Sequence, residues 1–202
     1  MNFSKLLFIS VCCLATLGCR GRWHDLGLER EGHYEQKLDA SKPLKLDLGV
    51  GGYKIEPGSS DKIVVTYWSR GNPRNVHIRL DAESGRNLLK IEAPHSNFRA
   101  TIEIPPQSDL STQLGVGNLD IKGITGNKDV SVGTGNLNLD VISADQYGKV
   151  DASTGIGNII ANPFGSTGHG IGSSLEKEGQ GKYRLHAHVG VGNLKLYAEN
   201  TM

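Results

Sequence analysis

Apolar and polar residues alternate along short segments of the chain from about residue 35 onward. The alternation is clear at residues 43–48, 62–68, 75–80 and 99–104. A period of two is typical of a half-buried β-strand, because successive side chains point to opposite faces. Turn-forming pairs separate the segments, namely Pro57-Gly58, Ser84-Gly85 and Pro105-Pro106. No later segment has the 3.6-residue period of an amphipathic helix, so the pattern predicts an all-β domain over residues 35–202.

A short motif, Gly-x-Gly-Asn followed by aliphatic residues, recurs in the second half of the chain. Its four copies begin at Gly115, Gly133, Gly155 and Gly190, and a degenerate copy begins at Gly49. The four copies start 18, 22 and 35 residues apart. Steps of 18 and 22 suit one coil of a β-solenoid, whereas the step of 35 indicates an insertion at the glycine-rich residues 165–181. We therefore predict a solenoid-like or sandwich-like stack of short strands.

The apolar positions on either side of each motif are an odd number of residues apart. Val132 and Leu137 are separated by five, so a straight strand would place them on opposite faces. Both reach one core only if the chain turns a corner between them, and glycine adopts the positive φ of such a corner at low cost. We expect at least one glycine of each pair to have φ > 0. The predicted structural corners are Gly115, Gly117, Asn118, Gly133, Gly135, Asn136, Gly155, Gly157, Asn158, Gly190, Gly192 and Asn193.

Stacking also explains the motif asparagines. If the shorter steps are coils, Asn118, Asn136 and Asn158 lie in register about 4.8 Å apart and form a ladder of amide hydrogen bonds. Asn193 is expected outside the ladder, because the 35-residue step interrupts the period. A calcium site, the alternative, would need aspartates in these positions. A dinucleotide site would need a helix after the glycines, where this chain has a strand. We therefore expect no cofactor.

The first 19 residues have the features of a bacterial lipoprotein signal. One charged residue, Lys5, precedes an apolar run at residues 6–17, which is too short to span a bilayer. The run ends in Ala15-Thr-Leu-Gly-Cys19, which resembles a lipobox, although Thr16 stands where leucine is more common. We predict a signal peptide over residues 1–18, a lipid on Cys19 and a tether over residues 19–34. A secreted protein without a lipid is the alternative.

The cysteine and charge distributions fit an exported protein. All three cysteines, Cys12, Cys13 and Cys19, lie in the first segment, so the β domain can form no internal disulfide. Apart from Lys5, the chain has 21 basic and 21 acidic residues, a balance that argues against a nucleic-acid partner. We expect the domain to be held at the membrane by the lipid on Cys19. We expect it in the cell envelope, and Arg20, which stands where an aspartate commonly retains lipoproteins at the inner membrane, permits the outer membrane in a Gram-negative cell.

The Gly-x-Gly-Asn repeat, placed after residues 102–106, resembles the putative-adhesin domain family of glycine-rich bacterial surface proteins. The resemblance covers roughly residues 40–198. It implies a solenoid-like fold on the cell envelope and a role in adhesion, scaffolding or the binding of an envelope protein or glycan. It brings no catalytic residues.

Several polar residues could still carry chemistry. His169, His186 and His188 are the candidate zinc ligands. Tyr67 and Trp68 share one apolar segment, where packing is favoured over sugar binding. A glycosidase would need two facing carboxylates, and the acids to consider are Asp129, Asp140, Asp145 and Asp151. We predict a non-catalytic envelope module without a metal, with a carbohydrate-active β-helix enzyme as the alternative. Two carboxylates that converge in a cleft would favour the enzyme.

Overall fold

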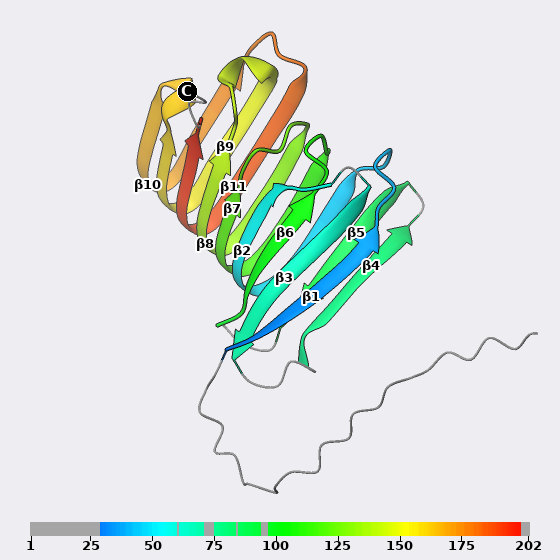
Figure 1. Cartoon of the computed structure of the whole chain (residues 1–202). Coiled ribbons are helices and arrows are strands. Elements are labelled where there is room, and N and C mark those ends of the chain that lie inside the picture. Colours follow the sequence, from blue (N-terminus) through cyan, green and yellow to red (C-terminus); the bar gives the residue numbers. More distant parts are fainter. Residues whose placement is uncertain (1–28, 60, 71–74, 84, 94–96, 199–202) are drawn as a thin grey trace, which may run out of the picture.

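The computed structural model describes residues 29–59, 61–70, 75–83, 85–93 and 97–198 (Figure 1). In this part of the chain the regular elements are eleven strands and two single-turn 3₁₀ helices, so the domain is all-β, as predicted. The predicted signal peptide, Cys19 and the first part of the tether lie outside the described residues. The elements are β1 (Glu29–Lys37), β2 (Leu44–Pro57), β3 (Lys62–Arg70), β4 (His77–Glu83), β5 (Arg86–Glu92), β6 (Arg99–Ile104), β7 (Leu110–Ile121), β8 (Lys128–Asp140), η2 (Ala144–Gln146), β9 (Tyr147–Ala161), η3 (Asn162–Phe164), β10 (Ser166–Glu178) and β11 (Tyr183–Tyr197).

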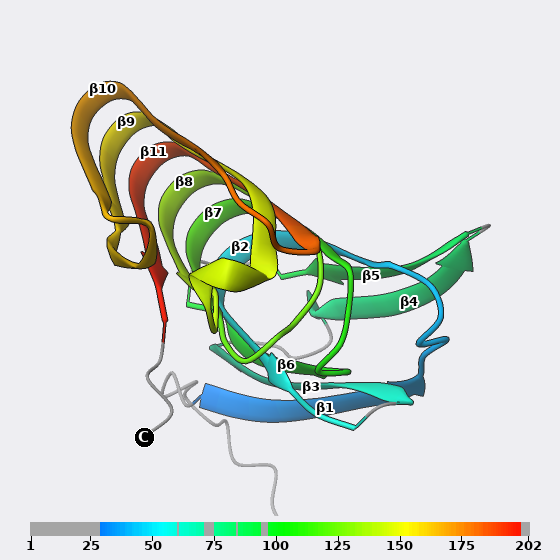
Figure 2. The same ribbon diagram turned by 90° about the horizontal axis from the view of Figure 1, so that it is seen from above.

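Six strands form a continuous stack in the order β2–β7–β8–β11–β9–β10. The first five are parallel to one another, and β10 pairs antiparallel with β9 at the end of the sheet. Each of the five parallel strands has 12 to 15 residues and bends near its middle, so the strands appear as nested arches from above (Figure 2). The two arms of each strand therefore lie in two facing layers. Within the described ranges, no helix has the length and apolar character needed to cross a membrane.

The order of strands in the stack differs from their order in the chain. β11 inserts between β8 and β9 and is parallel to both. The predicted insertion at residues 165–181 contains β10, which folds back on β9 through η3. The expectation of consecutive coils is therefore wrong at the 22-residue step, because β8 and β9 are not adjacent, whereas β9 and β11, whose motif copies are 35 residues apart, pair directly. All copies of the motif present the same bent backbone to a neighbour, so the repeat does not specify which copies become adjacent.

The two layers separate on the other side of β2. Residues Leu44–Leu48 of β2 pair with β5, which pairs with β4, and thus extend the first layer. The second half of β2 pairs with β6, which leads to β3 and β1 in the second layer. The strands of this half are short because each of them serves only one layer.

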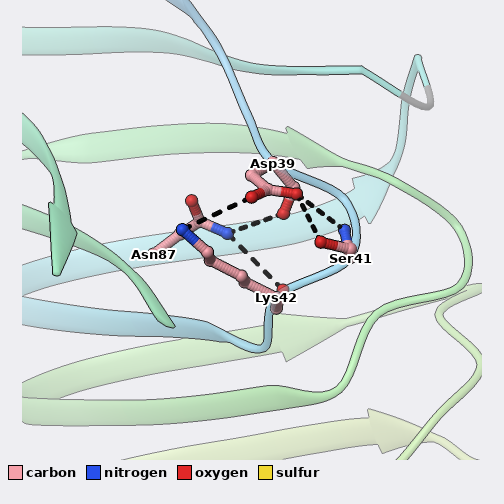
Figure 3. Close-up of polar contacts among 4 residues, drawn as sticks. All are labelled: Asp39, Ser41, Lys42 and Asn87. Carbon is pink, nitrogen blue, oxygen red and sulfur yellow. Dashed lines mark hydrogen bonds and ion pairs between the residues drawn. The ribbon is translucent and has the colours of Figure 1, made fainter. Parts of the chain in front are cut away.

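A buried asparagine fixes the turn that enters β2 (Figure 3). Asn87 of β5 donates from Nδ2 to the backbone oxygens of Asp39, at 2.9 Å, and Lys42, at 3.5 Å. Inside the turn, the Asp39 carboxylate accepts hydrogen bonds from the backbone and hydroxyl groups of Ser41 and forms an ion pair with Lys42. These hydrogen bonds lower the pKa of Asp39. The turn is thereby attached to the first layer.

One apolar core fills the space between the layers. Val132 and Leu137 of β8 are both fully buried although they are five residues apart, and so are Leu114 and Leu119 of β7. The bend between each pair turns the second residue back toward the core. Burial of one such aliphatic side chain contributes about 1.5–3 kcal/mol, so regular stacking of the bends directly stabilises the domain.

The domain begins earlier than the sequence pattern predicts. β1 starts at Glu29 and pairs with β3 along its whole length, so the predicted boundary at residue 35 is wrong. From Glu31 to Lys37 the strand has no buried residue, because it lies at an edge of the sheet. An exposed edge strand needs no apolar alternation, which is why the pattern did not reveal it.

Candidate functional site

The bends of the stacked strands carry the glycine pairs. The second glycine of each pair, at positions 51, 117, 135, 157 and 192, has φ between 140° and 153°. Such values are essentially restricted to glycine. Gly117 and Gly135 are neighbours in register, and a Cβ on Gly135 would lie 1.7 Å from the Gly117 carbonyl oxygen. The bend thus needs glycine both for its backbone conformation and for the close approach of adjacent strands.

The first glycine of each pair has a different role. Gly115, Gly133, Gly155 and Gly190 do not have positive φ. A Cβ on Gly133 would nevertheless lie 2.6 Å from the Gly115 carbonyl oxygen, and one on Gly155 or Gly190 would meet a carbonyl oxygen at 2.5 Å. At Gly115 the nearest oxygen would be 3.5 Å away, which is ordinary contact. Most of these positions therefore need glycine for strand spacing alone.

The motif asparagines form a ladder on the outer side of the bend. Asn136 donates from Nδ2 to Oδ1 of Asn118 at 2.8 Å, and Asn193 donates to Asn136 at 2.8 Å. Asn158 donates to Asn193 at 2.9 Å. His169 of β10 ends the ladder by donating from Nδ1 to Oδ1 of Asn158 at 3.0 Å. We call these four asparagines the amide ladder.

The place of Asn193 corrects the expectation from the sequence. Asn193 lies inside the ladder, between Asn136 and Asn158, because β11 inserts between β8 and β9. Asn136 and Asn158 are therefore not adjacent. The sequence also gave no indication of the last bend, in which Gly170-Ile171-Gly172 of the antiparallel strand β10 faces Ile156 and Gly157. Read backwards, this segment with His169 matches the motif, with histidine in place of asparagine.

An exposed apolar row follows the outermost residues of the bends. The middle residues of the glycine pairs are neighbours in register from β2 to β10. The exposed fractions of the five aliphatic members range from 37% at Val50 to 87% at Ile171. We call this row the apolar ridge; its members are Val50, Val116, Thr134, Val191, Ile156 and Ile171. Contiguous apolar side chains on a protein surface commonly mark an interaction site.

A shallow hollow of about 860 Å³ crosses the first residues of β7, β8, β9 and β11, and we call it the strand-start hollow. Asp129, His186 and Asp151 lie side by side in it on β8, β11 and β9. Lys149 forms an ion pair with Asp151 at 3.6 Å. Arg184 and Lys182 also line it, so the hollow carries charges of both signs.

The other candidate residues do not come together. Asp140 is buried at the end of β8, where it accepts a hydrogen bond from the backbone nitrogen of Ile142, and Asp145 lies in η2. His188 is bonded to the hydroxyl of Ser153 at 2.9 Å, away from His169. Among the residues that the structure describes, no three His, Cys, Asp or Glu side chains gather in a way that could hold a metal ion.

Tyr67 and Trp68 have different surroundings. Tyr67 packs on Phe98 with ring centroids 5.7 Å apart, and Phe98 lies against Gly51 in the bend of β2. Trp68 lies on the opposite, outer side of β3 and lines a hollow beside Asn118. Tyr67 therefore packs against the core as expected, whereas Trp68 is partly buried on the opposite face, because neighbouring residues of a strand face opposite sides.

Lys128 is a buried cation that the sequence pattern did not reveal. It is 2% exposed and lies in register with Leu110 and Leu185, at an inward-facing position. Its ammonium group donates to the hydroxyl of Tyr147 at 2.5 Å. Burial lowers the pKa of Lys128 to about 8, and the nearby Asp140 carboxylate partly opposes this shift. Its spacing of two residues before the buried Val130 could have indicated an inward-facing position.

Comparison with known proteins supports the fold. No protein-family model matches the chain, and no curated protein matches it in sequence. The crystal structure of a putative cell adhesion protein from Clostridium sporogenes is similar with a TM-score of 0.55 and 16% identity, over 84% of this chain and 100% of that chain. A putative adhesin from Bacteroides fragilis covers 83% of this chain and 97% of its own at 11% identity, with a TM-score of 0.31. The first likeness shows a putative-adhesin-like fold; the score of the second is too low to support an argument.

Proposed function

We propose that this protein is a non-catalytic lipoprotein of the cell envelope, anchored through a lipid on Cys19, whose solenoid-like β domain binds an envelope protein or glycan. The observation that carries this proposal is the apolar ridge. Five of the six stacked strands each expose one aliphatic side chain in this row, next to the amide ladder. A long, shallow and repetitive surface offers contact area rather than an enclosed reaction site.

The ridge can be tested with charged variants. Val116→Lys together with Val191→Lys would place two cations in the ridge, on strands separated by β8. We expect the full chain with both changes to lose the partners that the wild type retains from solubilised envelope. Ile160→Lys is the matched control, because Ile160 is an exposed apolar residue of β9 outside the ridge. Equal retention by all three proteins would refute a binding role for the ridge.

The anchor is tested separately. Cys19→Ser should abolish labelling by a fatty-acid analogue and should block removal of residues 1–18. Unchanged labelling in that variant would show that Cys19 is not the lipidated residue.

A carbohydrate-active enzyme is the second candidate, because Asp129 and Asp151 share the strand-start hollow. β11 separates their strands, so their Cα atoms are about 10 Å apart, two strand spacings. That distance leaves room for a substrate only if both carboxylates turn toward one glycosidic bond. Release of sugars from an envelope polysaccharide by the wild type, and not by Asp129→Asn with Asp151→Asn, would favour the enzyme.

A further inference from the structure

The amide ladder ends at Asn118, because the next strand, β2, has a glycine at the corresponding position. We call this position the missing rung. Asn118 faces Gly52 of β2 in register, and Gly52 faces Arg99 of β6, which in turn faces Trp68 of β3. The other three ladder amides donate in the direction of β2, and Oδ1 of Asn118 accepts from Asn136 on the β8 side, so we infer that Nδ2 of Asn118 faces the position where Gly52 has no side chain. No described residue accepts a hydrogen bond from this nitrogen. The ladder thus presents an amide donor to an open space.

The open space is a hollow of about 490 Å³ above Gly52. Trp68 and Arg99 form one wall, and Asn118 and Asp120 form the opposite wall. A second hollow of about 430 Å³ shares Gly52, Arg99 and Asn118 with the first and continues toward Val50 and Val116 of the apolar ridge. Each volume lies in the range of small-molecule sites, and the two together form a short groove.

We propose that this groove binds an N-acetylhexosamine, with its acetamido group in the place of the missing asparagine side chain. An acetamido group has the same carbonyl-and-N–H arrangement as the side chain of asparagine. Its oxygen can accept the hydrogen bond that Asn118 offers, just as Asn118 accepts one from Asn136. The ligand therefore continues the ladder by one rung.

The remaining walls fit a neutral sugar ring. The partly buried Trp68 indole provides an apolar face on which the C–H groups of a pyranose can pack. The Asp120 carboxylate accepts from Asn138 at 2.7 Å and has further acceptor capacity for a ligand hydroxyl. Lys54 is ion-paired with Glu56, and Arg99 lies across the groove from the Asp120 carboxylate, so the groove carries charges of both signs.

The decisive variant is Gly52→Asn, which supplies the missing rung from the protein itself. Gly52 does not have positive φ, and a Cβ there would lie 3.7 Å from Cγ of Arg99, which is ordinary contact. The new side chain can therefore be accommodated and can accept the hydrogen bond from Asn118. We expect this variant to melt at an equal or higher temperature than the wild type and to lose sugar binding at least tenfold. Trp68→Ala should also lose binding, without the gain in stability.

Binding is measured by calorimetry on the full chain in detergent, with three probes. Triacetylchitotriose and N-acetylglucosamine carry the acetamido group, and cellotriose has the same ring linkage without it. We expect the trimer to bind more tightly than the monosaccharide, because it can occupy both hollows, and cellotriose to bind at least tenfold more weakly. The control variant Ser174→Asn adds an asparagine to the exposed face of β10 and should leave binding unchanged.

Three results would overturn the proposal: no binding of either acetylated probe, equal binding of cellotriose, or unchanged binding by Gly52→Asn. Equal affinity for the monosaccharide and the trimer would overturn the use of the second hollow. Val116 borders the second hollow, but Val191 and Ile156 do not, so loss of envelope partners by Val191→Lys alone with unchanged binding of the acetylated probes, or the reverse, separates the ridge from this site.

Discussion

The two halves of the sheet form the two layers around the core in different ways. From β2 to β9, one strand serves both layers, because a glycine pair lets it bend between them without leaving its neighbours. On the other side of β2, two separate strands take the place of one bent strand. β5 pairs with the first half of β2 and β6 with the second half, and residues 93–98 connect them in the chain. There, Phe98 stands where the next bend would be, and its carbonyl oxygen accepts a hydrogen bond from Gly52.

The comparison shows that the glycine pairs take the place of packed side chains at one edge of the core. In the regular stack the backbones of adjacent bends are in contact, so there is no room for side chains between them. In the half without glycine pairs, the end of the core is filled by three rings: Phe98 lies 5.7 Å from both Tyr53 and Tyr67, measured between centroids. Backbone contact in one half and aromatic packing in the other are thus alternative ways to close the same edge of the core.

The largest effect is expected at the aromatic closure. Phe98 is fully buried, so Phe98→Ala should lower the free energy of unfolding by about 3–5 kcal/mol through the cavity that it leaves. Phe98→Leu, which keeps most of the apolar volume, should cost less than about 1.5 kcal/mol. Urea denaturation measures both losses. A small loss in Phe98→Ala would mean that the rings do not close the core.

The matching experiment in the regular stack is Gly135→Ala. The new Cβ would clash with the Gly117 carbonyl oxygen in a backbone conformation that alanine rarely adopts, so we expect a loss of about 3 kcal/mol or more. Gly85→Ala is the control, because Gly85 also has positive φ, at 88°, but has open space around it. Its loss should be only about 1–2 kcal/mol. Similar losses at the two sites would show that strand contact adds nothing to the need for glycine.

The buried cation of the stack predicts that the free energy of unfolding rises between pH 8 and 10. The pKa of Lys128 is lowered to about 8 in the folded protein, below its usual value, so between pH 8 and 10 the unfolded chain holds a proton that the folded chain has released. The stability should therefore rise by about 2 kcal/mol over this window. Above pH 10 the trend should reverse, because burial raises the pKa of Tyr53 and Tyr147 and only the unfolded chain then ionises these residues.

Lys128→Met isolates this contribution. Its apolar side chain should suit the row of Leu110 and Leu185, make the protein more stable at pH 7 and remove the rise between pH 8 and 10. Denaturant titrations at several pH values measure the slope. The same rise in the variant would assign the dependence to another group.

The smallest effect is expected in the amide ladder. Asn136→Ala removes one donated and one accepted hydrogen bond, and partial exposure lets water replace them, so we expect a loss of about 1 kcal/mol. Asn118→Ala removes only the bond at the end of the ladder and should cost about half as much. Thermal melts with and without excess calcium provide the measurement. A calcium-dependent rise in the midpoint that disappears in Asn136→Ala would make the bends a binding site for the ion.

The sequence by itself determined the strands and the bends of the regular half. The odd spacing between Val132 and Leu137 required a corner, and only the glycines between them could form it, because the parity of a strand and the steric limits on φ are local properties. The strands and their pairing in the N-terminal half were harder to predict from the sequence. From Glu31 to Lys37, β1 has no fully buried residue to produce an apolar alternation, and no local motif shows that β5 and β6 pair with the same strand.

Tertiary structure alone decided which copies became neighbours. β9 and β11 carry the same bend, so either could have paired with β8, and the arrangement that places Asn193 between Asn136 and Asn158 depends on β10 folding back on β9. Non-local pairing likewise brought Trp68, Arg99 and Asn118 to the two sides of Gly52. The repeat specifies the bent shape of each strand. Because the repeated strands offer the same backbone hydrogen-bonding edges, their order in the sheet is determined by the strand pairing of the complete domain.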